Sequence, residues 1–331
     1  MAAGGAGPSV VVRQLEKRYG TVAAVRGISL EVAAGETFGL LGPNGAGKTT
    51  TIGMLCTLVR PSAGSAEVAG FDVVRQRDQV RRRIGLVFQD PTVDDYLTAA
   101  ENLRFHAELY GVPAAEVGPR MRQVLELVDL WERRDSVVRE FSGGMKRRLE
   151  IARGLLHSPR VLFLDEPTVG LDPQTRAHIW AYINELRRRE AVTIVMTTHY
   201  MDEAEYCHRI GIMDGGSLVV VDTPAALKAA VGADRVELRT ADNAQAVRAL
   251  AERLGIAAVA QEGLVHFQVP GGATFIPRLF AELGVEILSV SVARASLDDV
   301  FMSHTGRTIR EAEASAGDRL RAAPMIRAHR R

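Results

Sequence analysis

A glycine-rich segment near the N-terminal end of the chain has the residue types and spacing of a phosphate-binding loop. It follows an apolar run, precedes a helical run, and reads Gly42, Pro43, Asn44, Gly45, Ala46, Gly47, Lys48, Thr49 and Thr50. It fits the pattern G-x-x-x-x-G-K-S/T. Glycines let backbone N–H groups point at phosphate oxygens, and a helix N-terminus adds partial positive charge. We expect Lys48 to reach the β- and γ-phosphates of a nucleoside triphosphate and the Thr49 hydroxyl to bind Mg²⁺.

Two adjacent acids end a second apolar run. Asp165 and Glu166 directly follow residues 161–164, which have the composition of a buried parallel strand. Open α/β sheets bind ligands at the carboxyl ends of their strands. Asp165 is therefore expected to hold Mg²⁺, directly or through water, and Glu166 to orient and deprotonate an attacking water. The second acid favours hydrolysis over binding alone.

A third segment has the features of a second anion site. Ser142, Gly143 and Gly144 precede an amphipathic helical run at residues 146–157. Ser142 can cap that helix, and the two glycines leave backbone N–H groups bare at its N-terminus. One chain would bind one nucleotide, yet it has two phosphate-binding elements. The simplest explanation is that the second element binds the ATP of a partner chain.

In their order, these segments resemble the motifs of ABC ATPases over roughly residues 8–230. Ser142 to Gly144 resemble the core of the LSGGQ signature loop, which this chain changes to Phe141 and Met145 at its two ends. The resemblance implies ATP and Mg²⁺ as cofactors. It also implies four further roles: stacking on adenine for Tyr19, contact with Mg²⁺ and water for Gln89, a place at the dimer interface for Asp172, and contact with the γ-phosphate for His199.

A closer resemblance is to exporter ATPases of the daunorubicin-resistance type. It is carried by residues 87–94, residues 142–149, and residues 297–301 followed by Thr305 and Gly306. It implies a homodimer of ATPase subunits that works with an integral membrane permease at the cytoplasmic face of a bacterial cell membrane. It further implies export of a drug, an antibiotic or a lipid-like substrate.

The elements that must position these residues alternate between short apolar strands and helical runs. This alternation predicts an α/β ATPase core with a mixed sheet over residues 8–230, with an inserted α-helical subdomain at about 92–160. Residues 235–306 read as strand, helix, two strands, helix and strand, which predicts a small α+β accessory domain of the split-βαβ kind. Ser296 to Asp299 predict a capping box before a last helix. Residues 307–331, with seven arginines, are expected to form a loose basic tail.

Composition limits the classes of function. The 331 residues are 47% hydrophobic and 24% charged with a net charge of +1, so we expect a folded protein and no nucleic-acid partner. Two cysteines make no disulfide framework and suit a reducing cytoplasm. The chain contains no apolar run of the roughly 18 residues that a spanning helix needs. Residues 1–9 lack the features of a signal peptide. We therefore expect another chain to supply any membrane span.

The alternative interpretation is a soluble ABC-type ATPase in DNA repair or translation. Repair proteins of this type usually separate the two glycine motifs by a long coiled coil, whereas here the motifs lie about a hundred residues apart without heptads. Translation factors of this type usually fuse two ATPase domains, and this chain has one. A simple P-loop kinase has no use for the Ser142 segment.

Overall fold

The structure, a computed structural model, describes residues 7–232, 234–261, 263–293 and 295–306. The chain forms two compact units that divide between Asp222 and Thr223. Helix α8 (Pro224–Val231) therefore belongs to the second unit, although the sequence expectation extends the ATPase domain to residue 230. The basic tail expected at residues 307–331 lies outside the described residues.

A six-stranded sheet forms the centre of the first unit, in the order β10-β9-β3-β8-β7-β6. Its strands are β3 (Thr37–Leu41), β6 (Ile84–Val87), β7 (Val161–Asp165), β8 (Thr193–Thr198), β9 (Arg209–Asp214) and β10 (Ser217–Asp222). All of them run parallel except β10. Every residue of β3, β7 and β8 is buried, which explains their continuous apolar composition. The segments that follow β3, β8, β7 and β6 consequently meet at one edge of the sheet.

A second, antiparallel sheet has the order β2-β1-β4-β5. It consists of β1 (Val10–Tyr19), β2 (Val22–Val32), β4 (Ala63–Val68) and β5 (Phe71–Asp72). Strands β1 and β2 are longer than their apolar cores indicate, because pairing continues through polar residues such as Glu16 opposite Arg26. One hydrophobic core joins this sheet to β3 and to helix α1 (Lys48–Leu55).

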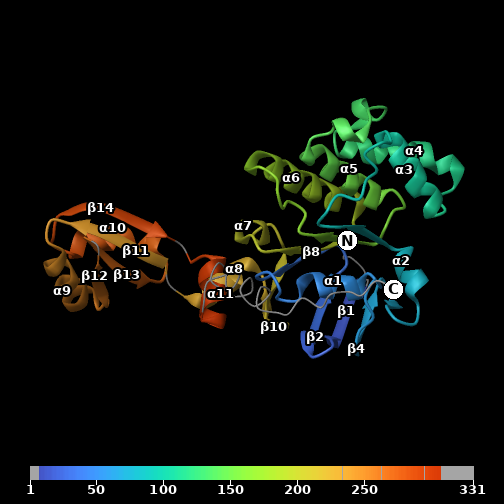
Figure 1. Ribbon diagram of the computed structural model, residues 1–331. Helices are drawn as coiled ribbons and strands as arrows, with labels where there is room; N and C mark the ends of the chain where they lie inside the picture. Colours follow the sequence, from blue (N-terminus) through green and yellow to red (C-terminus); the bar gives the residue numbers. More distant parts are fainter. Residues whose placement is uncertain (1–6, 233, 262, 294, 307–331) are drawn as a thin grey trace, which may run out of the picture. The chain divides into compact units, whose positions relative to one another are not determined.

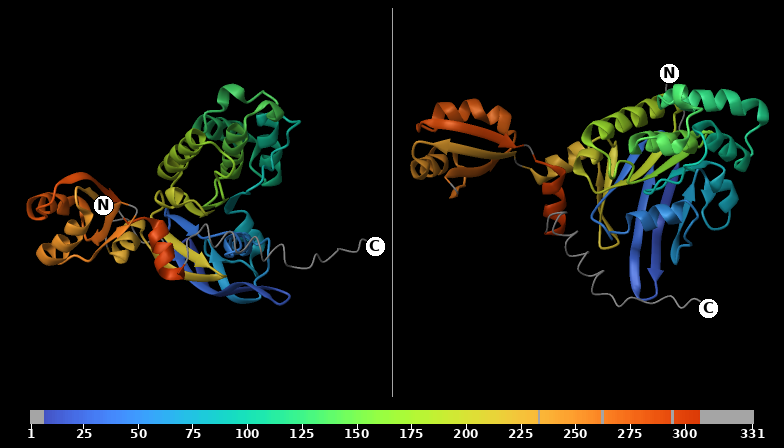
Figure 2. Two further views of the ribbon diagram at one scale, coloured as in Figure 1. Left: turned by 60° about the vertical axis from the view of Figure 1, so that its left-hand side comes forward. Right: turned by 45° about the horizontal axis from the view of Figure 1, so that its top comes forward.

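Helices gather at the other end of this unit, where the green and yellow-green ribbons lie apart from the blue strands β1 and β2 (Figures 1 and 2). They are α3 (Ala99–Leu109), α4 (Ala114–Leu127), α5 (Gly143–Leu155) and α6 (Pro173–Glu190). The unit also contains the short helices α2 (Arg77–Arg81) and α7 (Met201–Ala204). Helix α3 begins at a capping box formed by Thr98 and Glu101.

The second unit holds a four-stranded antiparallel sheet in the order β12-β13-β11-β14. Its elements are β11 (Asp234–Thr240), α9 (Asn243–Leu254), β12 (Ala258–Gln261), β13 (Leu264–Val269), α10 (Gly272–Glu282) and β14 (Ile287–Ala293). This is the predicted element order, and the helices and strands share one core. The predicted capping box at Ser296 and Asp299 opens α11 (Leu297–Thr305), which packs on α8. Within the described residues, no helix is both long enough and apolar enough to cross a membrane.

Candidate functional site

The glycine-rich loop joins β3 to α1, and two of its glycines have no room for a side chain. A Cβ on Gly42 would lie 2.3 Å from the carbonyl oxygen of Met213. Gly47 has a φ of 100°, and its Cβ would lie 2.5 Å from the carbonyl oxygen of Ala24. At both positions the backbone of a neighbouring segment approaches the loop, so the loop conformation depends on glycine. Asn44 and Gly45 are exposed at the loop tip, and Ala46 is buried.

Lys48 places its positive charge between this loop and the acids. Its side chain is buried, and the ammonium donates to the carbonyl oxygens of Gly42 at 2.7 Å and Pro43 at 3.1 Å. The same nitrogen lies 3.7 Å from Oε1 of Glu166. An ammonium in this position can pair with the phosphates of a bound nucleotide.

Asp165 receives two hydroxyl donors on one carboxylate oxygen. Thr49 Oγ1 donates to Oδ1 at 3.2 Å, and Thr197 Oγ1 donates to the same atom at 2.5 Å. Burial raises the pKa of Asp165, and these two hydrogen bonds act in the opposite direction. The Thr49 hydroxyl and the Asp165 carboxylate are thus neighbouring hard oxygen ligands, the kind that Mg²⁺ prefers. The structure therefore joins two of the predicted metal ligands.

Glu166 has a left-handed backbone and a well-defined carboxylate position. Its φ is 46°, and its N–H donates to the Thr197 hydroxyl at 3.0 Å. Its Oε1 lies 3.2 Å from Nδ1 of His199. Burial acts to raise the pKa of Glu166, but the hydrogen bond from His199 and the charge of Lys48 outweigh it and lower the pKa. The carboxylate is therefore ionised at neutral pH and can accept a proton from water.

The sequence patterns do not predict a role for Thr197. It is the residue of β8 that pairs with Asp165 of β7 in the parallel register. The sequence does contain one indication of such a role, because Thr197 places a hydroxyl near the end of an apolar strand, two residues before His199. That signal becomes specific only once β7 and β8 are known to be neighbours.

Tyr19 and the phosphate loop line one small pocket. This pocket has a volume of about 190 Å³, and Tyr19, Thr49, Thr50 and Asp165 contribute to its wall. Tyr19 is 49% exposed, and the ammonium of Lys17 lies 4.8 Å from the centre of its ring. An exposed ring beside the phosphate site is suited to stacking on a nucleotide base.

Gln89 lies directly after Phe88 at the end of the β6 segment and is exposed. In the described part of the chain, no hydrogen bond joins its side chain to Thr49 or Asp165. The structure thus brings Gln89 to the correct edge of the sheet but not into contact with the other two predicted metal ligands.

The signature segment lies in a different pocket. Ser142 caps α5, and its hydroxyl accepts the N–H of Met145 at 3.3 Å. A Cβ on Gly144 would lie 2.4 Å from a methyl carbon of Thr175. Asp172 caps α6 and its carboxylate accepts a hydrogen bond from the Thr175 hydroxyl at 2.6 Å.

Ser142 and Gly144 line a pocket of about 440 Å³ that shares no residue with the Tyr19 pocket. Gly143 is exposed at the start of α5. In a single chain, the two predicted anion sites are therefore separate.

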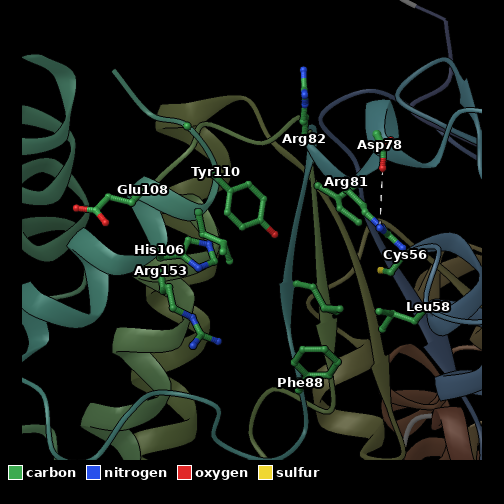
Figure 3. A pocket seen from close by; sticks show the side chains of 14 residues that line it. Cys56, Leu58, Asp78, Arg81, Arg82, Phe88, His106, Glu108, Tyr110 and Arg153 are labelled. Atoms are coloured by element: carbon green, nitrogen blue, oxygen red, sulfur yellow. Dashed lines mark ion pairs between the residues drawn. The ribbon is translucent and has the colours of Figure 1, made fainter. Parts of the chain in front are cut away.

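A larger pocket, of about 890 Å³, lies between the helices and the sheet; we call it the α3–β6 pocket. Figure 3 shows His106, Tyr110 and Arg153 on one side of it, and Leu58, Arg81 and Phe88 on the other. Because Phe88 precedes Gln89, this pocket adjoins the segment that leads to the site.

Comparisons with known proteins agree with this geometry. Residues 25–169 match the ABC transporter family, and residues 223–305 match the C-terminal domain of DrrA1-3-like ATP-binding proteins. The chain is 40% identical to the daunorubicin resistance ATP-binding protein DrrA2 of Streptomyces coeruleorubidus, over 93% of this chain and 98% of that protein. It is 37% identical to the linearmycin resistance ATP-binding protein LnrL of Bacillus subtilis, over 90% of this chain and 98% of that protein.

Solved structures support the same assignment. The chain resembles cbiO1 of Clostridium perfringens, part of the ABC transporter complex cbiONQ, with a TM-score of 0.63 and 29% identity over 67% of this chain and 91% of that one. It also resembles the dimeric post-hydrolysis state of the ATP-binding cassette MJ0796 bound to ADP and Pi, with a TM-score of 0.58 and 26% identity over 65% and 98% of the two chains. The predicted fold class is confirmed. The chain therefore belongs to the ATP-binding proteins of ABC transporters, and it is an ATPase of the daunorubicin-resistance type.

Proposed function

We propose that this ATPase powers export of a drug, an antibiotic or a lipid-like compound through a separate integral membrane permease. The observation that carries the proposal is the match to resistance proteins over 93% of the chain, which includes the C-terminal unit as well as the ATPase unit. Relatives named for Nod factor export match over a similar length. The protein would act at the cytoplasmic face of a bacterial cell membrane.

Within one chain, the site residues support the following division of labour. The loop from Gly42 to Thr50 and the ammonium of Lys48 bind the phosphates of ATP. Mg²⁺, which would neutralise phosphate charge, fits beside the Thr49 hydroxyl and the Asp165 carboxylate. Gln89, which follows β6 at the same edge of the sheet, is the third residue that we assign to this site. Glu166 takes a proton from the attacking water, and His199 holds the carboxylate in place.

The complete site includes a second copy of the chain. Ser142, Gly143, Gly144 and Asp172 cannot serve the ATP bound in their own chain, because they line or flank a separate pocket. In a head-to-tail dimer, these groups would contact the γ-phosphate held by the partner subunit. The existence of dimeric cassettes among the structural relatives supports this arrangement. Loss of the γ-phosphate then removes the charge that joins the two subunits, and the dimer opens.

The α3–β6 pocket is the surface we assign to the permease. Arg81, Arg82 and Arg153 give it positive charge, opposed in part by Asp78 and Glu108. Leu58, Phe88 and Leu109 give it an apolar wall. This lining suits a short permease helix with apolar and acidic side chains. Movement of that helix would reach Gln89 through Phe88.

Two experiments test the proposal. Light scattering of Glu166→Gln with and without Mg-ATP should show a shift from monomer to dimer that depends on ATP. No shift in a variant that binds ATP means either that the permease is needed for closure or that the dimer interpretation is wrong, and co-expression with the permease then decides between the two. In the native host, deletion should lower resistance to an exported compound, and wild type but not Glu166→Gln should restore it. Stimulation of ATPase activity by nucleic acid would favour the repair alternative instead.

A further inference from the structure

A buried arginine near the start of α5 contacts two distant segments of the ATPase unit. The Arg147 side chain is 6% exposed. Its Nε donates to the carbonyl oxygen of Pro167 at 2.6 Å, and its Nη2 donates to those of Asp165 at 3.2 Å and Glu166 at 3.1 Å. Its Nη1 donates to the carbonyl oxygen of Phe88. A planar guanidinium with several fixed donors can bind such a set of carbonyls at once.

Glu150, one turn further along α5, balances this charge. It is fully buried, and its Oε2 accepts from Nη1 of Arg147 at 3.1 Å. Its Oε1 accepts the N–H of Thr92 at 2.5 Å and the Thr92 hydroxyl at 3.0 Å. Burial lowers the pKa of Arg147, and the Glu150 carboxylate opposes that shift. Both members of this buried ion pair are thus extensively hydrogen-bonded, which such a pair requires in order not to be costly.

The Arg147–Glu150 pair joins three segments that lie apart in the amino-acid sequence. These are the acid segment at residues 165–167, the segment at residues 88–92 that contains Gln89, and helix α5 that begins after Ser142. Arg153 extends the contacts: its Nη1 donates to the Thr92 carbonyl at 2.9 Å, and it lines the α3–β6 pocket with Phe88 (Figure 3). A continuous set of contacts therefore runs from that pocket to the Glu166 backbone.

The backbone conformation of Glu166 is unfavourable and needs contacts that hold it in place. Its φ of 46° is uncommon for a residue with a side chain, and Pro167 follows it. Unfavourable backbone conformations persist when surrounding contacts hold them. Thr197 holds the Glu166 N–H, and Arg147 holds the carbonyls of Asp165, Glu166 and Pro167. Arg147 thereby fixes the peptide groups on the carboxyl side of both acids.

We propose that Arg147, paired with Glu150, is a positioning residue for ATP hydrolysis that aims the Glu166 carboxylate and couples it to the Phe88–Thr92 segment. The proposal rests on the proposed role of Glu166 as the general base. Arg147 itself touches neither nucleotide nor water in this scheme. It acts by setting where the Glu166 side chain leaves the backbone.

Replacement by lysine separates charge from geometry. An ammonium can still pair with Glu150, but it is a compact point charge with three donors and cannot replace the planar fork that binds carbonyls from two segments. Arg120 provides a matched control on another helix. It donates to the carbonyl oxygens of Leu155 and Leu156 at the far end of α5, so its loss weakens the packing of α5 without touching the acids.

The experiment measures ATPase kinetics of the full chain for wild type, Arg147→Lys and Arg120→Lys, together with binding of a fluorescent ATP analogue. We expect Arg147→Lys to lower kcat by about 10- to 100-fold, as a misplaced catalytic group does. KM and analogue affinity should stay within about threefold of wild type, because Lys48 and the phosphate loop do not contact Arg147. Arg120→Lys should change kcat by less than about twofold. In a Glu166→Gln background, Arg147→Lys should cause no further loss of residual turnover.

Three results would overturn the inference: an unchanged kcat in folded Arg147→Lys, an equal loss in Arg120→Lys, or a full additional loss in the Glu166→Gln background. If Arg147→Lys does not fold, Glu150→Gln tests the same link, since it weakens the pairing while keeping an acceptor oxygen; unchanged kcat there also contradicts the proposal. Wild-type turnover by Glu166→Gln alone would instead refute the role assigned to Glu166.

Discussion

The Thr197 hydroxyl lies 2.5 Å from Oδ1 of Asp165, across the neighbouring parallel strands β8 and β7. The same hydroxyl accepts the N–H of Glu166 at 3.0 Å. One side chain on a neighbouring strand therefore holds the carboxylate of the first acid and the backbone of the second.

Thr197→Val should lower both stability and turnover. The variant leaves the buried Glu166 N–H without its partner, at a cost of about 1–3 kcal/mol. It also removes one of the two hydroxyl groups that donate to the Asp165 carboxylate, so we expect a higher Mg²⁺ concentration for half-maximal ATPase activity and a lower kcat. Urea unfolding and Mg²⁺ titration of activity measure the two effects. Thr193→Val is the control, because its hydroxyl makes two hydrogen bonds at the opposite end of β8. Equal kinetic losses in both variants would contradict a specific role for Thr197.

Glu166→Gln should bind ATP normally and lose turnover by at least about 100-fold, since general-base catalysis contributes that order of rate enhancement. The amide keeps the size of the side chain near Lys48 and His199 but cannot accept a proton. Phosphate release and equilibrium ATP binding, measured on the same preparation, separate the two effects. A near wild-type rate excludes Glu166 as the base.

Ser142→Arg should abolish assembly of the ATP-bound dimer without weakening ATP binding to the single chain. Ser142 caps α5 in a pocket separate from the Tyr19 pocket, and a bulky cation there would block the partner's nucleotide. Light scattering of the double variant Glu166→Gln, Ser142→Arg with Mg-ATP should show monomer, whereas Glu166→Gln alone should show dimer. A double variant that still dimerises and hydrolyses at the single-variant rate would disprove the shared site.

Acid should destabilise the ATPase unit through His106. Burial, with Arg153 and His157 nearby, lowers the pKa of His106 from 6.5 to about 3, and its Nε2 is buried without a hydrogen bond in the described structure. Because the folded-state pKa lies below the unfolded value, the unfolded chain takes up the proton first. Stability is then lost as pH falls below about 6.5, by up to about 1.4 kcal/mol per pH unit.

His106→Phe keeps the ring contact with Tyr110 and removes this titration. Urea midpoints at pH 7.5 and 5.5 should therefore differ less in His106→Phe than in wild type. Burial also lowers the pKa of His157, so part of the acid sensitivity should remain. His304→Gln, which changes an exposed histidine of the second unit, is the control. An unchanged pH dependence in His106→Phe would show that His106 is already solvated in the native state.

The local motifs could be predicted because their chemistry is contiguous in the sequence. The loop ending at Lys48 and the adjacent pair Asp165 and Glu166 carry their function within a few residues, and their flanking apolar runs mark the strands. The starts of the helices capped by Ser142 and Ser296 can likewise be predicted, since a capping side chain accepts a hydrogen bond from the first turn of its own helix. The less apolar strands were harder to predict, because β4 (Ala63–Val68) exists through its pairing with β1 rather than through a local pattern.

The sequence by itself determined the fold class, the order of the nucleotide-binding motifs and the residues of the phosphate loop and the acid pair. Only the tertiary structure decided that β8 lies beside β7, which gives Thr197 its two partners, and that Arg147 reaches the backbone of Glu166. It also decided that Ser142 and Thr49 line separate pockets. The physical reason is that these contacts join residues far apart in the chain. Strand order and helix packing set such distances, and no local periodicity encodes them.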